Sequence, residues 1–196
     1  MNLDLSPVEY AARLASQVPY RIMEDSGLRW LAKQASTRFR IVNVGCWTGA
    51  STMALAAASP GFVYAVDPWD VEHCQFVKPL YRSWAEGRSS EWMYQTFLNN
   101  MVPVKNVFPI RATSMEAATM LHGVRFDMAF IDASHKYYDV VDDITAWRQL
   151  LVPGGLLCGH DYQHDEVGEG VIRAVDELIP QSAVGPDGIW YWRLPL

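Results

Sequence analysis

The sequence has few cysteines, no cluster of basic residues and no long apolar run. Its three cysteines among 196 residues form no CxxC pair and no paired framework, which is typical of a reducing compartment. Sixteen basic against 22 acidic residues, without a basic stripe, argue against nucleic acid as a partner. No apolar run approaches the roughly 18 residues of a membrane span, and the first residues lack a signal-peptide pattern. These absences predict a cytoplasmic protein with no membrane partner and a small-molecule substrate.

Half of the residues are hydrophobic, enough for the core of one domain over residues 1–196. The first 38 residues read as helical, with Ser6 and Pro7 as the start. Strand and helix patterns then alternate, which predicts an α/β protein whose parallel sheet is covered on both faces. The expected strands are 40–45, 62–67, 106–112, 126–132, 156–161 and 188–194, and the expected helices are 50–60, 90–101, 114–121, 137–151 and 170–180.

Polar residues end several of the expected strands. In open parallel sheets, ligands bind beyond the carboxyl ends of the strands. This rule gathers Gly45, Asp67, Ala112, Asp132 and Asp161 along one edge of the sheet. The sequence therefore predicts a site at this edge.

The stretch NVGCWTGAST (43–52) places two glycines four residues apart between a strand and a helix. Glycine allows a sharp turn and the close approach of a ligand to the backbone. The spacing is not G-x-G-x-x-G, so the dinucleotide fingerprint is not met. Asp67 follows Gly45 by 22 residues and is placed to accept hydrogen bonds from a ribose diol. The alternative is that Asp67 caps the turn after its strand.

Five stretches carry a family resemblance. They are VNVGCWTGAST, VYAVDPWD, IRATSMEAA, FIDASHKYYDVVDD and LLVPGGLLCGHDY, which run from about residue 41 to 162. Taken in this order, they resemble the class I S-adenosylmethionine-dependent methyltransferases. The likeness is to the branch of macrolide and cephamycin O-methyltransferases, with catechol O-methyltransferases more distant. The resemblance implies a three-layer Rossmann-like fold with helices on both faces and an antiparallel last strand.

The resemblance also implies which residues bind the cofactor, S-adenosylmethionine. Most members carry an acid where Asn43 stands, which helps to hold the ammonium group of the cofactor. Asn43 can still accept a hydrogen bond, but without charge assistance. The implied set is Asn43, Gly45, Thr48, Gly49 and Ser51 for the methionine part and ribose, Asp67 for the ribose hydroxyls, Trp69 beside the adenine, Thr113 and Ser114 near its edge, and Asp132.

Asp132, His160 and Asp161 match the positions of metal ligands in the metal-dependent relatives. Two carboxylates suit a hard cation such as Mg²⁺, whereas an imidazole suits Mn²⁺ and softer ions better. A divalent metal, Mg²⁺ or Mn²⁺, is therefore expected. The alternative is that His160 hydrogen-bonds the substrate and that no metal binds.

His135 lies three residues past Asp132, where relatives place a base. A neutral imidazole can accept a hydroxyl proton near neutral pH. His135 is therefore the expected catalytic residue, and its alternative role is to cap the helix from 137. Asp142 and Asp143 are expected to face solvent near the start of that helix, where they would interact with its dipole.

The insertion 68–104 is rich in aromatic residues: Trp69, Tyr81, Trp84, Trp92, Tyr94 and Phe97. At the mouth of the sheet they would form a lid that excludes water. The alternative is that they pack the insertion onto the domain.

The sequence thus predicts an enzyme that moves a methyl group from S-adenosylmethionine to a hydroxyl of a small molecule. Three alternatives stay open: a nicotinamide-dependent oxidoreductase, a non-catalytic module that binds S-adenosylmethionine, and a methyltransferase with another kind of acceptor. The identity of the acceptor and the formation of a homo-oligomer are not encoded by such patterns.

Overall fold

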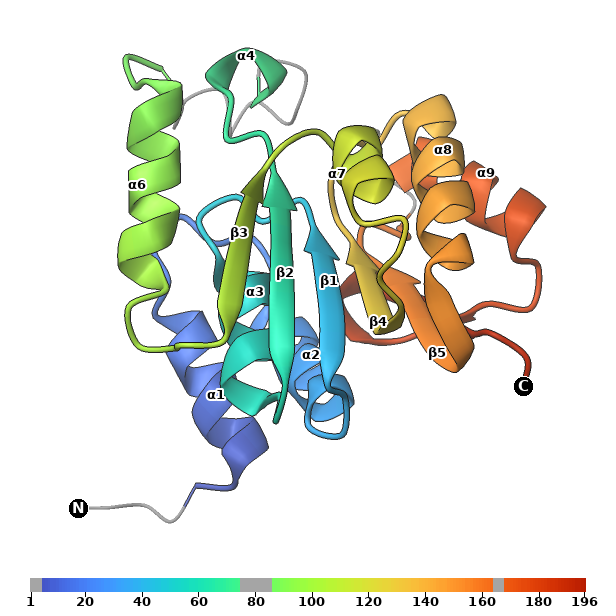
Figure 1. Cartoon of the computed structure of the whole chain (residues 1–196), viewed down its shortest axis with the longest axis horizontal. Helices are drawn as coiled ribbons and strands as arrows, with labels where there is room; N and C mark the ends of the chain where they lie inside the picture. The colour runs from blue at the N-terminus through green and yellow to red at the C-terminus, as the bar shows by residue number, and fades with distance from the viewer. Residues whose placement is uncertain (1–4, 75–85, 164–167) are drawn as a thin grey trace.

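A seven-stranded sheet forms the centre of the molecule (Figure 1). The computed structural model describes residues 5–74, 86–163 and 168–196. The strand order is β3-β2-β1-β4-β5-β7-β6; β1 to β5 are parallel, and β7 is antiparallel to β5 and to β6. The strands are β1 (Arg40–Val44), β2 (Phe62–Asp67), β3 (Val107–Arg111), β4 (Phe126–Ile131), β5 (Leu151–Gly159), β6 (Ala183–Val184) and β7 (Trp190–Arg193). The predicted mostly parallel sheet with an antiparallel last strand is confirmed.

Helices cover both faces of the sheet, as predicted (Figure 1). One buried cluster joins α1, α2, α3 and α6 to the sheet, and a second joins α7, α8 and α9 to the opposite face. The helices are α1 (Pro7–Ser16), α2 (Asp25–Ala35), α3 (Ala50–Ala58), α4 (Val71–Cys74), α6 (Ser90–Asn100), α7 (Ser114–Met120), α8 (Tyr137–Gln149) and α9 (Gly168–Leu178). The three-layer α/β architecture is confirmed.

Strand β1 explains why the predicted strands are apolar on both faces. Ile41 is buried with the α1–α3 cluster, whereas Val42 and Val44 are buried with the α7–α9 cluster. Successive side chains of a strand point to opposite faces, so both sets are removed from water. Asn43 lies on the α3 face and is fully buried.

The N-terminal segment is helical but interrupted. The predicted start is confirmed: Ser6 caps α1 in a capping box with Glu9. The helical segment consists of two helices, because α1 ends at Ser16 and α2 begins at Asp25. Pro19 and the left-handed Tyr20 (φ 60°) lie in this break. The segment between the two helices reaches the carboxyl edge of the sheet.

Strand β5 begins earlier than predicted. The helix expected to end at residue 151 ends at Gln149, and Leu151 already pairs with Phe126 of β4. The pairing then shifts register between Phe126 and Met128. Gly154, with φ +76°, lies in the irregular part of β5. The Pro-Gly-Gly sequence thus bends a strand instead of ending a helix. The short strand β6 was not predicted.

The described aromatic residues of the 68–104 insertion pack inward. Trp69 and Phe97 are fully buried, and the Trp69 ring lies 4.6 Å from Phe97 and 5.0 Å from Tyr94 between centroids. Trp92 makes an edge contact with Tyr20. Tyr81 and Trp84 lie outside the described residues. The lid therefore stays a prediction, while Trp69 and Phe97 pack this part of the insertion into the core that it shares with α1, α2 and α3.

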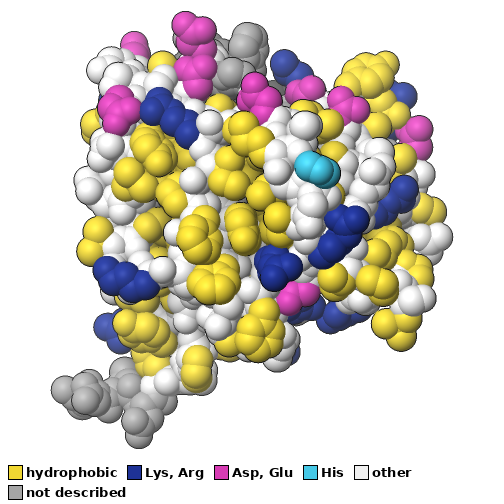
Figure 2. Space-filling model, in the orientation of Figure 1, with side chains coloured by type: hydrophobic (Ala, Val, Ile, Leu, Met, Phe, Trp, Pro, Cys, Tyr) yellow, Lys and Arg dark blue, Asp and Glu magenta, His cyan; other side chains and the backbone are white. Residues whose placement is uncertain are grey.

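The surface differs between the carboxyl edge and the middle of the sheet. Acidic side chains gather along the edge where β1 to β3 end (Figure 2). Hydrophobic side chains cover β2 and β3, where Phe62 and Phe108 are half exposed and pack together. Within the described ranges, no helix has the length and apolar character needed to cross a bilayer.

Candidate active site

A cavity of about 570 Å³ opens at the carboxyl ends of β1, β2 and β4. This is the edge of the sheet at which the sequence predicts a site. Eight of the predicted site residues line the cavity: Gly45, Thr48, Ser51, Asp67, Thr113, Ser114, Asp132 and His135. The other five predicted residues, Asn43, Gly49, Trp69, His160 and Asp161, lie behind this lining.

Gly45 brings the loop after β1 into contact with the end of β4. Its φ is +84°, and its N–H donates to the Val66 carbonyl at 2.9 Å. A Cβ at this position would lie 1.9 Å from the Asp132 carbonyl oxygen. Both observations require glycine, because a side chain would be strained and would overlap the backbone of β4.

The Asp67 carboxylate holds the glycine loop (residues 45–49) in place. One oxygen accepts the N–H groups of Cys46 and Trp47, each at 2.9 Å, and the other accepts that of Trp69 at 2.6 Å. These three bonds explain how Trp47 and Trp69 keep left-handed φ values of 48° and 43°. Asp67 also lines the cavity.

Asn43 connects β1 to the first turn of α3. Its amide nitrogen donates to the hydroxyls of Ser51 (3.0 Å) and Thr52 (2.8 Å). Its Oδ1 is buried and has no hydrogen-bond partner among the described residues. An orphaned acceptor of this kind is uncommon, since most buried polar atoms are paired. This acceptor lies beneath the glycine loop, behind the lining of the cavity.

The remaining residues predicted around the glycine loop have structural partners. The Thr48 hydroxyl donates to the Pro19 carbonyl at 2.8 Å and so ties the loop to the segment between α1 and α2. Gly49, at φ +103°, precedes α3 and packs against Phe97 and Met101. The Trp69 indole donates to the Trp47 carbonyl at 2.9 Å. Trp69 is thus placed in the core beneath the loop.

The opposite end of the cavity holds a buried acid that the sequence reasoning placed in solvent. Thr113 caps α7, and the Ser114 hydroxyl contacts the Asp143 carboxylate and accepts the Trp147 indole N–H at 2.9 Å. Asp143 is only 3% exposed, so its predicted solvation is wrong. Burial raises the pKa of Asp143 to about 6. The helical spacing of the sequence indicates this burial, because Asp143 lies on the same face of α8 as Val140, Ile144 and Trp147.

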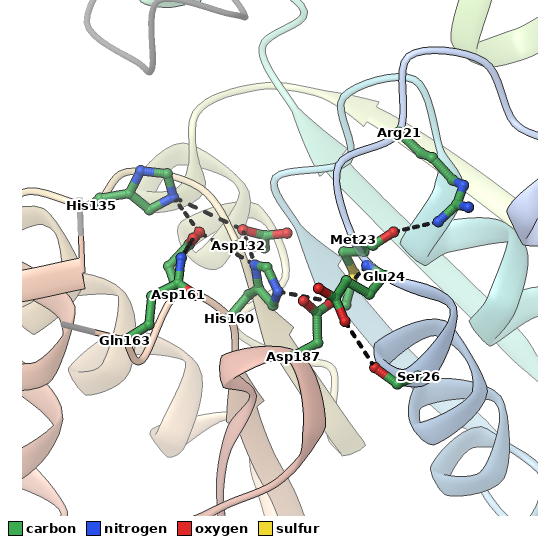
Figure 3. Close-up of polar contacts among 10 residues, drawn as sticks. All are labelled: Arg21, Met23, Glu24, Ser26, Asp132, His135, His160, Asp161, Gln163 and Asp187. Atoms are coloured by element: carbon green, nitrogen blue, oxygen red, sulfur yellow. Dashed lines mark hydrogen bonds and ion pairs between the residues drawn. The ribbon is translucent and has the colours of Figure 1, made fainter. Parts of the chain in front are cut away.

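Asp132, His135 and Asp161 come together from β4, the loop after it and the end of β5 (Figure 3). The Nε2 of His135 lies 2.9 Å from Asp161 and 4.0 Å from Asp132. One ligand atom from each of the three residues lies within 4.8 Å of the other two. Asp161 has φ 59°, a conformation that Asp tolerates better than most residues.

His160 lies on the other side of the same carboxylates. Its Nδ1 is 3.3 Å from Asp161 and 3.8 Å from Asp132, and its Nε2 is 3.2 Å from Asp187 (Figure 3). Asp187 was not predicted as a site residue. A turn was signalled by the GPDG sequence, but no local pattern reveals that this turn meets β5.

The electrostatics of this cluster are dominated by its carboxylates. Burial lowers the pKa of His135, but the carboxylates of Asp132 and Asp161 outweigh it and raise the pKa to about 9. Burial also opposes charge on His160, and Asp132, Asp161 and Asp187 raise its pKa to about 11. Burial would raise the pKa of Asp161, yet the two imidazoles hold it well below its usual range. With both pKa values above 7, the two rings carry a proton at pH 7 and offset two of the three carboxylate charges.

The donor set fits a divalent cation. Two carboxylates and an imidazole are ligands of Mn²⁺ and similar ions, and their spacing allows one ion to contact all three. The Nε2 atoms of His135 and His160 are buried and lie near carboxylates, but neither makes an aligned hydrogen bond among the described residues. The three residues whose ligand atoms lie close enough to share one ion include His135. The sequence instead predicts His160 as the third ligand, together with Asp132 and Asp161.

Comparisons with known proteins give one family match and several solved structures of the same fold. The sequence profile of the family described as a methyltransferase domain (Methyltransf_24) matches residues 42–162. No curated protein sequence matches the chain significantly. The O-methyltransferase TomG from Streptomyces achromogenes, solved with S-adenosylmethionine and involved in tomaymycin synthesis, is 18% identical; the match covers 99% of this chain and 92% of TomG, with a TM-score of 0.65. An O-methyltransferase from Bacillus cereus, in complex with SAH, is 16% identical over 99% and 93% of the two chains, with a TM-score of 0.57.

Proposed function

The chain belongs to the methyltransferase domain family, and from that premise we propose that it transfers a methyl group from S-adenosylmethionine to a hydroxyl of a small molecule. The family membership agrees with the resemblance found in the sequence. One observation carries the finer proposal: the glycine loop and the pair Asp132 and His135 line the same cavity. A site for a cofactor and a site for its reaction partner thus face each other across one space.

The glycine-loop side of the cavity fits the cofactor. Gly45, Thr48 and Ser51 line this side, and the left-handed Gly45 packs the loop against the end of β4. Asp67 lines the cavity at the end of β2, the position at which an acid can accept hydrogen bonds from ribose hydroxyls. The acidic lining suits a ligand that carries an ammonium and a sulfonium charge. When bound, S-adenosylmethionine supplies an electrophilic methyl group.

The Asp132 side of the cavity serves the acceptor. Asp132 and Asp161 are the carboxylates that would hold a divalent cation, which when bound positions the acceptor oxygens. His135 lines the cavity next to both acids, and its imidazole is the base for the proton of the acceptor hydroxyl. Such a base contributes roughly 10²–10⁴-fold in rate.

The role of His135 depends on what the two carboxylates bind. Facing Asp132 and Asp161 alone, the ring holds a proton at pH 7 and cannot act as a base. With both carboxylates committed to a cation, the charges that keep this proton are neutralised. A single nitrogen of His135 cannot hold the cation and accept the proton at once. We assign the cation to the carboxylates and the proton to His135.

Thermal unfolding tests the cofactor class. The protein is heated with S-adenosylmethionine, S-adenosylhomocysteine, NADH or NADPH, each with Mg²⁺, Mn²⁺ or EDTA. A ligand at about 100 times its dissociation constant stabilises by roughly 2.7 kcal/mol, which raises the Tm by roughly 5–10 °C in a chain of this size. We expect this shift with the two sulfur cofactors alone. A shift only with a nicotinamide, or with none of the four, contradicts the proposal.

A further inference from the structure

His160 is held between carboxylates on both sides of its ring. The Nδ1 atom faces Asp161 at 3.3 Å and Asp132 at 3.8 Å, and the Nε2 atom faces Asp187 at 3.2 Å (Figure 3). The His160 side chain is 6% exposed and that of Asp187 is 12% exposed. A buried imidazole with an acid at each nitrogen has little freedom to rotate, so the acid on the far side fixes how the ring meets the site.

Asp187 is itself anchored by the N-terminal part of the chain. It lies in the turn Pro186–Gly188 between β6 and β7, at φ 58°. Its Oδ2 accepts the N–H of Glu24 at 2.8 Å, at the start of α2, where no side chain of the helix itself provides a cap. A Cβ on Gly27 would lie 2.4 Å from the same Oδ2, so α2 approaches Asp187 closely because this residue is glycine.

The segment that Asp187 anchors is also a wall of the cavity. Arg21, Ile22 and Met23 line the cavity directly before Glu24. Arg21 stiffens this wall, since its guanidinium donates to the Met23 carbonyl at 2.6 Å and pairs with Asp25 at 2.8 Å. Asp187 therefore touches the cavity wall through Glu24 and the carboxylate cluster through His160.

We propose that Asp187 is a positioning residue of the site: it orients His160 against Asp132 and Asp161 and thereby sets the two carboxylates for the cation. The inference rests on the proposed function, of which it explains the cation-binding half. Asp187 does not reach the cavity, so its effect passes through His160. Acids that orient a metal site from outside are typically worth 10–100-fold in metal affinity.

A purely structural role for Asp187 has a different consequence. If its only task were to cap α2, then Asp187→Asn would change the Tm and leave cation affinity unaltered. The variant keeps an oxygen for the Glu24 N–H but loses the negative charge beside His160. Affinity for Mn²⁺, which is measured by electron paramagnetic resonance without substrate, therefore separates the two roles.

The matched control is Asp127→Asn. Asp127 accepts the N–H groups of Phe39 (2.7 Å) and Arg40 (3.1 Å), so it also ties two distant segments, but at the amino end of the sheet. We expect Asp187→Asn to weaken Mn²⁺ binding about tenfold and Asp127→Asn to leave it within about twofold. If Asp187→Asn does not fold, Asp187→Ser, which also keeps an oxygen for Glu24, replaces it.

A double-mutant cycle with His160→Ala tests the path of the effect. If Asp187 acts through His160, Asp187→Asn should have no further effect on Mn²⁺ affinity in the His160→Ala protein. An unchanged affinity in the wild-type background, or an equal loss in both backgrounds, overturns the inference. A wild-type protein that binds S-adenosylhomocysteine but not Mn²⁺ also overturns it while the cofactor proposal stands. A protein that binds neither overturns the proposed function itself.

Discussion

The glycine loop and the Asp/His cluster (Asp132, His135, His160, Asp161 and Asp187) flank one cavity but are held in different ways. The loop is fixed by backbone groups: Asp67 accepts three N–H groups, and Gly45 packs directly on the backbone of β4. The cluster is fixed by buried charges, with two imidazoles between three carboxylates. The first arrangement stabilises the fold, whereas the second concentrates charge that a bound cation or substrate could use.

Because of this difference, substitutions in the glycine loop and in the Asp/His cluster should have different effects. Changes in the glycine loop should reduce the stability of the whole protein, because they break the backbone junction of β1, β2 and β4. Changes in the cluster should mainly alter what binds there. The predictions below take the expected effects in order of size.

Gly45→Ala should give the largest loss. The new Cβ would overlap the Asp132 carbonyl at 1.9 Å and would sit at φ +84°, so we expect destabilisation by about 4 kcal/mol or failure to fold. Gly87→Ala is the matched control, since Gly87 is also left-handed (φ +72°) but the added Cβ would have no atom of the described residues within 4 Å. It should cost about 1–2 kcal/mol in urea unfolding. Equal losses would show that φ, not the contact with β4, requires Gly45.

Asp67→Ala should give the next largest effect. It removes the acceptor of three N–H groups in a half-buried loop, and we expect a loss of about 3 kcal/mol in the free energy of unfolding. Asp70→Ala is the comparison, because Asp70 also lines the cavity and accepts from Ser90 and Glu72 nearer the surface. A loss no larger than that of Asp70→Ala would mean that Asp67 does not hold the loop.

Asp143→Asn should give a smaller, pH-dependent gain. The folded state holds the Asp143 proton up to about pH 6 and the unfolded chain only up to about pH 3.8, so wild-type stability falls as pH rises through this window. The variant has no such penalty. The difference in free energy of unfolding between Asp143→Asn and wild type should therefore shift in favour of the variant by about 2 kcal/mol between pH 4 and pH 7.5. Asp142→Asn, at an exposed neighbour whose charge is a minor cause of the raised Asp143 pKa, should show a much smaller pH difference. Equal profiles for the two variants contradict the assignment.

Much of the glycine-loop side could be predicted from the sequence because its signals are local. Glycine at 45 and 49, the strand before them and the acid at the end of β2 all follow from short patterns. What could not be predicted is which groups the acid holds: Asp67 binds three backbone N–H groups, and Trp69 lies in the core beneath them. Such partners depend on how tightly the loop closes.

The Asp/His cluster was predicted in part because its members come from separate segments. Asp132, His135, His160 and Asp161 end two neighbouring strands, and parallel order brings them to one edge. Asp187 arrives through the antiparallel strand β7, whose register against β5 no local pattern gives. His135 faces Asp161 and so completes the group of Asp132, His135 and Asp161. This contact likewise depends on the left-handed backbone at Asp161.

The most direct measurement is a calorimetric titration of S-adenosylhomocysteine into three proteins: wild type, Asp67→Asn and His135→Ala. If the glycine loop binds the cofactor and the Asp/His cluster serves the acceptor, His135→Ala should bind within about twofold of wild type. Asp67→Asn should bind at least about tenfold more weakly, because it loses a charged acceptor at the cofactor. No binding by wild type, or an equal loss in both variants, would contradict this division of the site.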